Sequence, residues 1–440
     1  MLKTLRDAFK IKDLRKKMFY TMLMLIVIRI GSQIPVPGVN RDYFSNWLAQ
    51  QNANAAGAFN FFSAFTGGSF ERMSILALNI TPYITASIII ELLTIAIPAL
   101  EEMQRDGSDG RKKLQSIMRY TTVGLSVFES VAMSIGFGRS GLFEKFNFIS
   151  VLTAVVCLTA GSTFLMWVGE RITEKGVGNG ISIVLTINIL SRVPQSIATL
   201  FDQFVFTKTV AQGIMAAVVI FAIILLTVVL CIVLNDATRK IPVQYAKKMQ
   251  GRRLVGGQSS GIPLKVNTAG VIPVIFASSL MSIPQIIISF VRKSPSGVGG
   301  TIVGMLNENN WFNPANWIYS VGLILYVVFI IFFAYFYTSI TFNPIEVADN
   351  MKKQGGFIPG IRPGKPTEDY LNNVLNYIIF IGAVGLTVVV IIPIIFNGLF
   401  SASVSFGGTS IIIIVSVILE TIKQIESQMV VRNYKGFLNE

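Results

Sequence analysis

The sequence of 440 residues contains no histidine, only two cysteines and few charged side chains. Without histidine, most of the nucleophile–base pairs that enzymes use for acyl transfer cannot be built. Cys157 and Cys231 both lie within apolar runs, where a cysteine usually packs as a small hydrophobic side chain. The sequence also has no cluster of metal-ligating residues, which excludes zinc and haem chemistry. We therefore expect no enzymatic activity, no metal and no cofactor.

Charged residues make up 14% of the chain, whereas a soluble domain has roughly 25%. Hydrophobic residues make up 52%, and the mean hydropathy is +0.62. A helix needs about 20 mostly apolar residues to cross a bilayer, and continuous apolar runs favour helices over a barrel. We expect an all-α membrane protein with ten transmembrane helices. The predicted spans are residues 18–34, 73–97, 120–137, 148–168, 179–191, 210–234, 269–291, 317–340, 374–395 and 409–422.

The distribution of lysine and arginine predicts the orientation of these spans, because cytoplasmic loops carry an excess of basic residues. If the N-terminus is cytoplasmic, Arg29 lies in the first span and only eight of the 37 basic residues lie in the outer loops. These eight are Arg41, Arg72, Arg139, Lys145, Arg192, Lys208, Arg292 and Lys293. We therefore expect both termini to be cytoplasmic.

Two long loops, roughly 235–267 and 341–373, then lie on the cytoplasmic side and flank the seventh and eighth spans. The first loop is strongly basic, which fits either attraction to anionic lipid or docking of a large anionic partner such as ribosomal RNA. The second loop contains QGGFIPGIRPGKP, in which seven of thirteen residues are glycine or proline. This composition predicts a compact tip that presents Arg362 and Lys365.

Two glycine-rich motifs do not match nucleotide-binding loops. GIRPGKPT at 360–367 has too few residues between its glycines for a phosphate loop, and GVGNG at 176–180 follows no predicted strand. Ionisable residues within the spans are sparse, and we expect Arg29 to form a charge pair or bind carbonyl groups. An ion-coupled solute transporter with ten spans is therefore a weaker alternative. A membrane-anchored scaffold that uses the basic loops is another.

Six separated segments carry a resemblance to a known family. They are GSQIPVPGVN (31–40), GGSFERMSILALNITPYITASIIIELL (67–93), MWVGERITEKGVGNGISI (166–183), GIPLKVNTAGVIPVIFASS (261–279), FNPIEVADNMKKQGGFIPGIRPG (342–364) and FGGTSIII (406–413). Together they resemble the SecY family, the channel subunits of the bacterial Sec translocase. The similarity covers essentially the whole chain, with the motifs in the family's order.

The resemblance implies a clamshell of two inverted five-helix halves, residues 1–191 and 192–440, around a central pore. Unfolded secretory polypeptides would cross the bacterial cytoplasmic membrane through this pore. Signal sequences and membrane helices would leave sideways into lipid through a lateral gate, between the second and third spans on one side and the seventh and eighth on the other. The motor ATPase SecA or a translating ribosome would supply the energy, and SecE and SecG would complete the complex.

The resemblance also implies roles for individual residues. A ring of bulky aliphatic side chains would dewet and so seal the idle pore; its members would be Ile80, Ile84, Leu185, Ile189, Ile275 and Ile413. Leu185 departs from the isoleucine that is usual in the family. A plug near 56–65 would close the outer funnel with Ala56, Phe59, Phe61, Phe62 and Phe65. The partner-docking residues at the loop tips would be Arg252, Arg253, Arg362 and Lys365.

Overall fold

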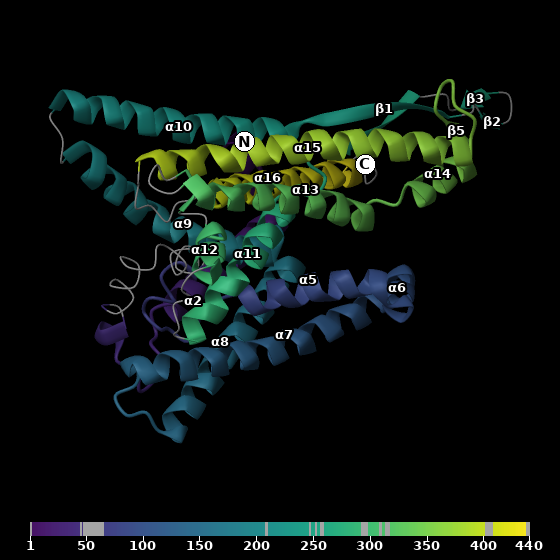
Figure 1. The fold of residues 1–440 in the computed structure, drawn as a ribbon. Coiled ribbons are helices and arrows are strands. Elements are labelled where there is room, and N and C mark those ends of the chain that lie inside the picture. The colour runs from purple at the N-terminus through teal and green to yellow at the C-terminus, as the bar shows by residue number, and fades with distance from the viewer. Residues whose placement is uncertain are drawn as a thin grey trace.

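The computed structural model is mostly helical, as the composition predicts. The structure describes residues 2–44, 46, 66–206, 210–245, 248–250, 253–255, 259–291, 298–307, 310–312, 317–400 and 408–436. In Figure 1 the helices form two layers, one above the other, with further helices between them. The two layers diverge toward one side of the molecule, so that the outline is an open V.

The lower layer in Figure 1, which we call the N-terminal lobe, contains four helices from the first half of the chain. They are α5 (Thr81–Ala96), α6 (Pro98–Arg105), α7 (Gly107–Phe137) and α8 (Phe148–Lys175), with a short π-helix, η1 (Gly138–Leu142), after α7. The preceding helices are α1 (Leu2–Lys10) and α2 (Lys12–Gly31), of which α2 packs against α8. Helix α9 (Gly180–Phe201), continued by the π-helix η2 (Asp202–Phe206), connects the two layers.

The upper layer in Figure 1, which we call the C-terminal lobe, contains five helices. They are α10 (Val210–Asp236), α13 (Val321–Thr341), α14 (Pro344–Lys353), α15 (Lys365–Phe400) and α16 (Gly408–Gly436). Helices α11 (Ile272–Val291) and α12 (Val298–Met305) lie between the layers, and the 3₁₀ turn η4 (Trp317–Ser320) leads into α13. The V is widest between α6 of the N-terminal lobe and α14 of the C-terminal lobe.

Every predicted span overlaps one helix of the structure, but not every helix meets the criteria for crossing a membrane. Within the described residues, five helices are long and apolar enough to cross, and six if the bent pair α5–α6 is one span. One reason is that α7 buries the polar residues Ser126, Ser130 and Ser134 on its packed face, which lowers its hydropathy. Small polar residues allow close helix packing in membranes. The count of ten crossings therefore stays a prediction.

Two predicted spans have different boundaries in the structure. Residues 73–80 of the second span form turns with Met73 and Asn79 in the left-handed region, and the helix begins only at Thr81. The fifth span was expected to end at residue 191, but α9 continues through Pro194 to Phe201. The predicted span ends directly before Arg192, whereas the helix continues past this charged residue and past Pro194.

The two long loops that the sequence predicts to be cytoplasmic form one small β-structure. Strand β1 (Thr238–Tyr245) pairs antiparallel with β4 (Ser259–Lys265) and with β5 (Gly356–Phe357), so the sheet order is β4-β1-β5. The hairpin β2 (Lys248–Gln250) and β3 (Arg253–Val255) extends from it. Ile241 and Val243 of β1 pack with Met351 of α14 and Leu371 of α15. The sheet thus joins segments from both loops on one apolar core.

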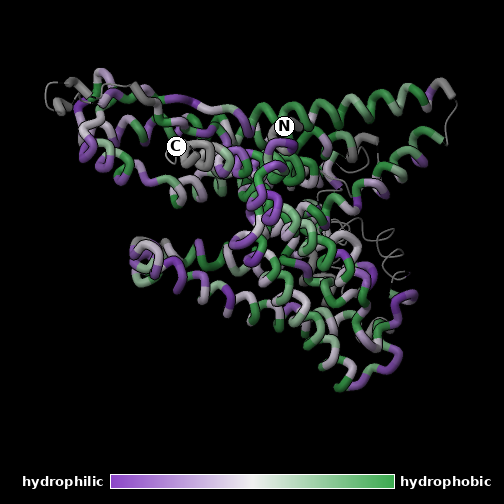
Figure 2. Tube along the Cα trace, turned by 180° about the vertical axis from the view of Figure 1, so that it is seen from behind, coloured by the Kyte–Doolittle hydropathy of each residue, from purple (hydrophilic) through white to green (hydrophobic). Residues whose placement is uncertain are grey.

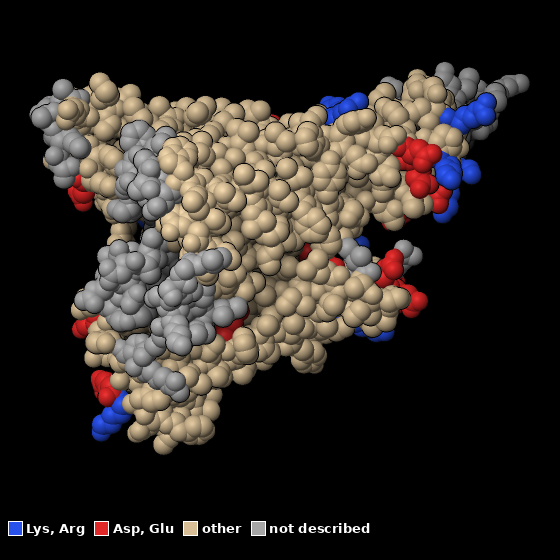
Figure 3. Space-filling view, in the orientation of Figure 1, with Lys and Arg blue, Asp and Glu red and all other residues tan. Residues whose placement is uncertain are grey.

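Polar and apolar residues are separated along the molecule. Figure 2 shows apolar residues along the long helices of both lobes. In Figure 3 charged side chains gather at the ends of the lobes, around α14 and the β-structure and at the tip of α6 and α7, with a broad uncharged surface between. This arrangement suits a lipid-embedded middle and ends that reach into water.

Candidate functional site

A compact apolar cluster lies where the two lobes meet. It consists of Ile84, Ile183, Leu185, Ile189, Val271, Ile275, Ile413, Ile414 and Val417. We call it the inter-lobe cluster, because its residues come from α5, α9, α16 and the region around the start of α11. Leu185, Ile189 and Ile413 are almost fully buried in it. Five of the six predicted ring residues therefore come together at one place.

The sixth predicted ring residue, Ile80, packs elsewhere. It is fully buried, but its neighbours are Ile28 of α2, Leu165 and Val168 of α8, and Val184 of α9. Ile80 is the N-cap residue of α5, directly before its first turn. Ile84 packs against both clusters and connects them.

The local sequence around α9 explains how Leu185 and Ile189 come to share a face. The Asn179 side chain accepts hydrogen bonds from the backbone N–H groups of Ile181 and Ser182, which starts the helix at a defined residue. Gly178, at φ +84°, supplies the left-handed turn before the cap. From this start, Leu185 and Ile189 are one turn apart on the same side of the helix.

The four helices predicted to form the lateral gate meet along the junction of the lobes. Ile84 and Ile88 of α5 pack against the core of the C-terminal lobe, which includes Phe276 of α11 and Ile330 of α13. Helix α7 also contacts α11. Phe276 and Phe333 meet edge to face, with ring centroids 5.6 Å apart. The packing between the lobes along this line is therefore apolar.

The predicted plug lies outside the described residues, as do all five of its assigned side chains, Ala56, Phe59, Phe61, Phe62 and Phe65. The described chain resumes at Thr66 and runs through a series of turns to α5. Gly67 and Gly68 have φ values of +62° and +84°, in the region that favours glycine. Ser74 in the same segment forms a bridge with Pro35.

Two of the predicted docking residues lie at a rigid tip. Arg362 and Lys365 are both exposed. The Thr367 hydroxyl, itself in a fully buried residue, donates to the carbonyl oxygen of Arg362 at 2.8 Å and closes the turn. Ile358 is buried in the core beneath the sheet. Proline and glycine therefore do form a compact tip, but its fixed shape also depends on contacts with distant residues.

Of the other two predicted docking residues, the structure describes only the backbone of Arg253. Arg252 lies outside the described residues, and Arg253 begins strand β3, where the backbone is described. Gln250 and Arg253 face each other at the last pair of the β2–β3 ladder. Arg253 therefore belongs to a β-hairpin and not to an irregular loop.

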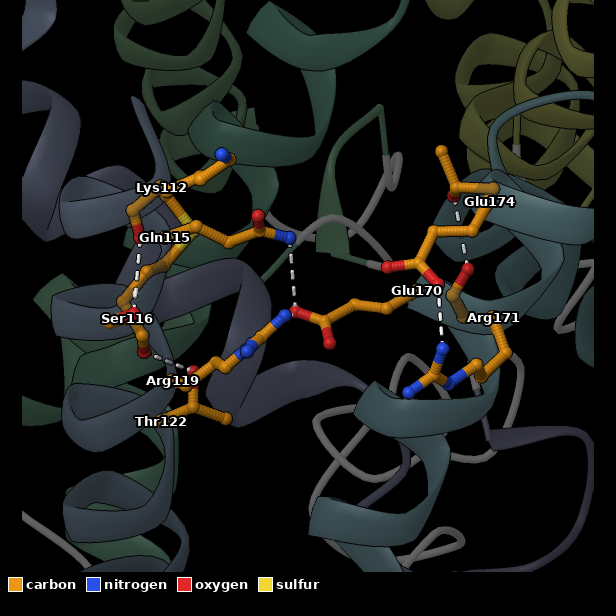
Figure 4. Close-up of polar contacts among 11 residues, drawn as sticks. Lys112, Gln115, Ser116, Arg119, Thr122, Glu170, Arg171 and Glu174 are labelled. Carbon is orange, nitrogen blue, oxygen red and sulfur yellow. Dashed lines mark hydrogen bonds and ion pairs between the residues drawn. The ribbon is translucent and has the colours of Figure 1, made fainter. Parts of the chain in front are cut away.

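A polar contact that the sequence patterns did not single out joins α7 to α8. The Glu170 side chain is about 10% exposed and accepts hydrogen bonds from Arg119 Nε at 2.8 Å and Gln115 Nε2 at 3.2 Å (Figure 4). One turn further along α8, Arg171 pairs with Glu174 on the exposed side. A glutamate at the end of an otherwise apolar span was the only sequence signal for this contact.

We expect Glu170→Ala to lower the free energy of unfolding by about 1–2 kcal/mol, since it leaves Arg119 and Gln115 without their shared acceptor. Arg119 is 43% exposed, so water compensates part of the loss. Glu174→Ala is the matched control, because it removes an exposed pair within one helix and should cost less than about 0.5 kcal/mol. Thermal denaturation in detergent compares the two. Equal shifts would contradict a stabilising role for Glu170.

No group of three or more possible metal ligands occurs among the residues that the structure describes. Both cysteines are free, with Cys231 buried. The Cys231 thiol lies 3.9 Å from the Ser416 hydroxyl, and Asn235 Nδ2 donates to the same hydroxyl at 2.8 Å. These contacts fit structural packing between α10 and α16.

Comparisons with known proteins agree with the fold and the motifs. The family model SecY matches residues 74–422. The protein translocase subunit SecY of Streptomyces scabiei is 44% identical over 451 residues, which cover 100% of both chains. Among solved structures, a protein-conducting channel superposes with a TM-score of 0.67 at 18% identity, over 94% of this chain and 93% of that one.

A second solved structure has the same architecture in a larger assembly. It is Sec61 in the canine ribosome–channel complex from the endoplasmic reticulum, with a TM-score of 0.60, 16% identity, and coverage of 94% of this chain and 93% of that one. At 18% and 16% sequence identity, these two structural similarities show only that the fold is shared. The family model and the full-length similarity at 44% identity establish more: this chain belongs to the SecY family.

Proposed function

We propose that this chain is the protein-conducting channel of a bacterial translocase. Unfolded secretory polypeptides cross the cytoplasmic membrane between the two lobes. The observation that carries the proposal is the inter-lobe cluster, to which four helices from both lobes contribute bulky aliphatic side chains. Solved protein-conducting channels that share the fold support it.

The chemistry of the inter-lobe cluster suits a seal that can open. Aliphatic side chains give a hydrated ion no group to bind, so a narrow passage lined by them dewets and blocks ions. The same side chains deform around a passing polypeptide without specific polar contacts. Ile80 lies directly before α5 and joins this ring when the lobes separate.

Signal sequences and membrane helices leave through a lateral gate between α5 and α7 on one side and α11 and α13 on the other. The apolar packing of Ile84 and Ile88 against Phe276 and Ile330 supports this assignment. When the lobes separate, lipid or an apolar segment of the substrate replaces these contacts at little cost, because these four side chains are aliphatic or aromatic and need no polar partner.

The cytoplasmic β-structure docks the partners that supply energy, the motor ATPase SecA or a translating ribosome. Arg252, Arg253, Arg362 and Lys365 provide the positive charge, and the exposure and fixed shape of the 358–367 tip support this role. Sec61 in the canine ribosome–channel complex has the same fold. Anionic lipid is the second candidate for these basic residues. The small subunits SecE and SecG complete the channel.

The topology follows from the distribution of charge. Both termini are cytoplasmic, and residues 1–191 and 192–440 are the two inverted halves. The segment 56–65 is the plug, which closes the outer side of the pore. The absence of charged residues from the broad middle surface supports a multi-pass position in the membrane (Figure 3).

Protein translocation into proteoliposomes tests the proposed function. Vesicles that contain this chain with SecE and SecG, supplied with SecA and ATP, are expected to protect a purified preprotein from added protease. The same preprotein without its signal sequence should stay accessible. If the preprotein is never protected and the vesicles instead accumulate a small solute saturably, the chain is a transporter and the proposal is wrong.

A further inference from the structure

Two buried asparagines lie directly beside predicted ring residues. Asn79 precedes Ile80 and is 1% exposed, and Asn188 precedes Ile189 and is 3% exposed. Nδ2 of Asn188 donates to Oδ1 of Asn79 at 2.9 Å. The bond joins α9 to the turn that leads into α5, so it connects two walls of the proposed pore within otherwise apolar surroundings.

Arg29 of α2 adds a third helix to this contact. Its Nη1 lies 3.5 Å from Oδ1 of Asn188, so both ends of the Asn188 amide face a polar partner. The Ser191 hydroxyl donates to the carbonyl oxygen of Asn188 at 2.7 Å. Arg29 therefore binds a carbonyl oxygen, as predicted, and this oxygen belongs to the side-chain amide of Asn188. α2, α9 and the start of α5 are held at one point.

The chain that follows the predicted plug packs against the same group. A Cβ atom on Gly67 would lie 2.7 Å from the Asn188 carbonyl oxygen and 3.0 Å from Arg29 Nη1, so only glycine fits there. An ion pair between Glu71 and Arg192 fastens the same turn to α9. The end of the chain that emerges from residues 56–65 is thus anchored on α9 beside Ile189.

We propose that Arg29, Asn79 and Asn188 form a polar clamp that holds the idle channel shut. The clamp fixes the rotation of α9 against the turn before α5, which keeps Leu185 and Ile189 in the inter-lobe cluster. Moving α9 breaks the hydrogen bond between the Asn188 and Asn79 side chains. The buried Asn188 Nδ2 then loses this acceptor, which is costly. The three residues are positioning residues, because they act through Leu185 and Ile189. The inference rests on the proposed channel function.

Planar-bilayer recordings of the purified complex test the clamp. We expect Asn188→Ala and Asn79→Ala each to raise the open probability of the idle channel about ten-fold, which matches the loss of one buried hydrogen bond. The double variant should leak less than the sum of the two single effects predicts, because both substitutions remove the same hydrogen bond between Asn79 and Asn188. Thr186→Ala is the matched control, since its hydroxyl bonds only the Ser182 carbonyl within α9 among the contacts that the structure records; it should stay closed.

Two further measurements separate the clamp from simple packing or misfolding. Asn188→Leu keeps the side-chain volume but removes the hydrogen bond, so it should leak like Asn188→Ala. The leaky variants should still translocate preprotein, whereas a misfolded chain would not. A sealed Asn188→Leu channel would contradict the clamp. Asparagine variants that stay closed, while the double variant Ile84→Gly and Ile275→Gly leaks, would also contradict the clamp but leave the proposed pore intact. If that glycine variant and a deletion of residues 56–65 both stay sealed as well, the proposed pore itself is wrong.

Discussion

Changing Ile84 and Ile275 together to glycine is expected to turn a sealed idle channel into one that conducts ions. Both side chains pack on the inter-lobe cluster, Ile84 from α5 of the N-terminal lobe and Ile275 from α11 between the lobes. Their removal leaves a gap between Leu185, Ile189 and Ile413 that the surrounding helices fill only in part. A gap large enough for water ends the dewetting that blocks ions.

The expected leak is at least about ten-fold above that of the unchanged channel, because the barrier depends on the absence of water from the constriction. Single-channel recording of the purified complex in planar bilayers measures it. Ile324→Gly is the matched control: it carries the same cost in helix propensity, but Ile324 is 65% exposed on α13, away from the cluster. It should leave the channel silent.

Deletion of residues 56–65 is a separate arm of the same experiment, and we expect it too to raise the leak. A leak after the deletion but none after the glycine substitutions would mean that the plug alone seals the pore. The inter-lobe cluster would then be ordinary helix packing. If no variant conducts ions, the assignment of the pore is wrong.

Arg362→Glu is expected to reduce SecA-driven translocation by about ten-fold or more. The substitution reverses the charge of an exposed side chain on a tip that the Thr367 hydroxyl and buried Ile358 hold in shape. A charge-assisted contact with a partner is lost and a repulsive one replaces it, and such a change is worth several kcal/mol at a docked surface. Preprotein protection in proteoliposomes, with SecA binding measured in parallel, gives the result.

Lys353→Glu is the matched control for Arg362→Glu. Lys353 is exposed at the end of α14, close in sequence to the tip, and the substitution changes the net charge by the same amount. If anionic lipid is the partner of the basic loops, both variants should weaken function equally and lipid composition should set the size of the effect. If SecA docks at the tip, only Arg362→Glu should weaken SecA binding.

Hydropathy and charge alone predicted the class of the protein correctly. A long apolar run is a local feature of the sequence, and in a lipid bilayer such a run is stable as a helix. The helical class and the family are confirmed. Five of the predicted ring residues also pack in one cluster. Their places in the motifs and the helix periodicity put each of them on the side of its helix that faces this cluster. Boundaries were less predictable: the fifth predicted span ends at residue 191, but α9 continues to Phe201.

Only the tertiary structure decided how distant segments combine. The sheet order β4-β1-β5 brings the second long loop onto the first, which no local pattern in either loop encodes. Ile80 packs with α2 and α8 instead of the inter-lobe cluster, and its place in the motif did not predict these neighbours, because they come from distant parts of the chain. The pairing of Asn79 with Asn188 likewise depends on packing between helices far apart in the chain. The sequence by itself determined which segments are apolar and helical, because both properties are local, and the packing of the lobes determined which side chains face one another.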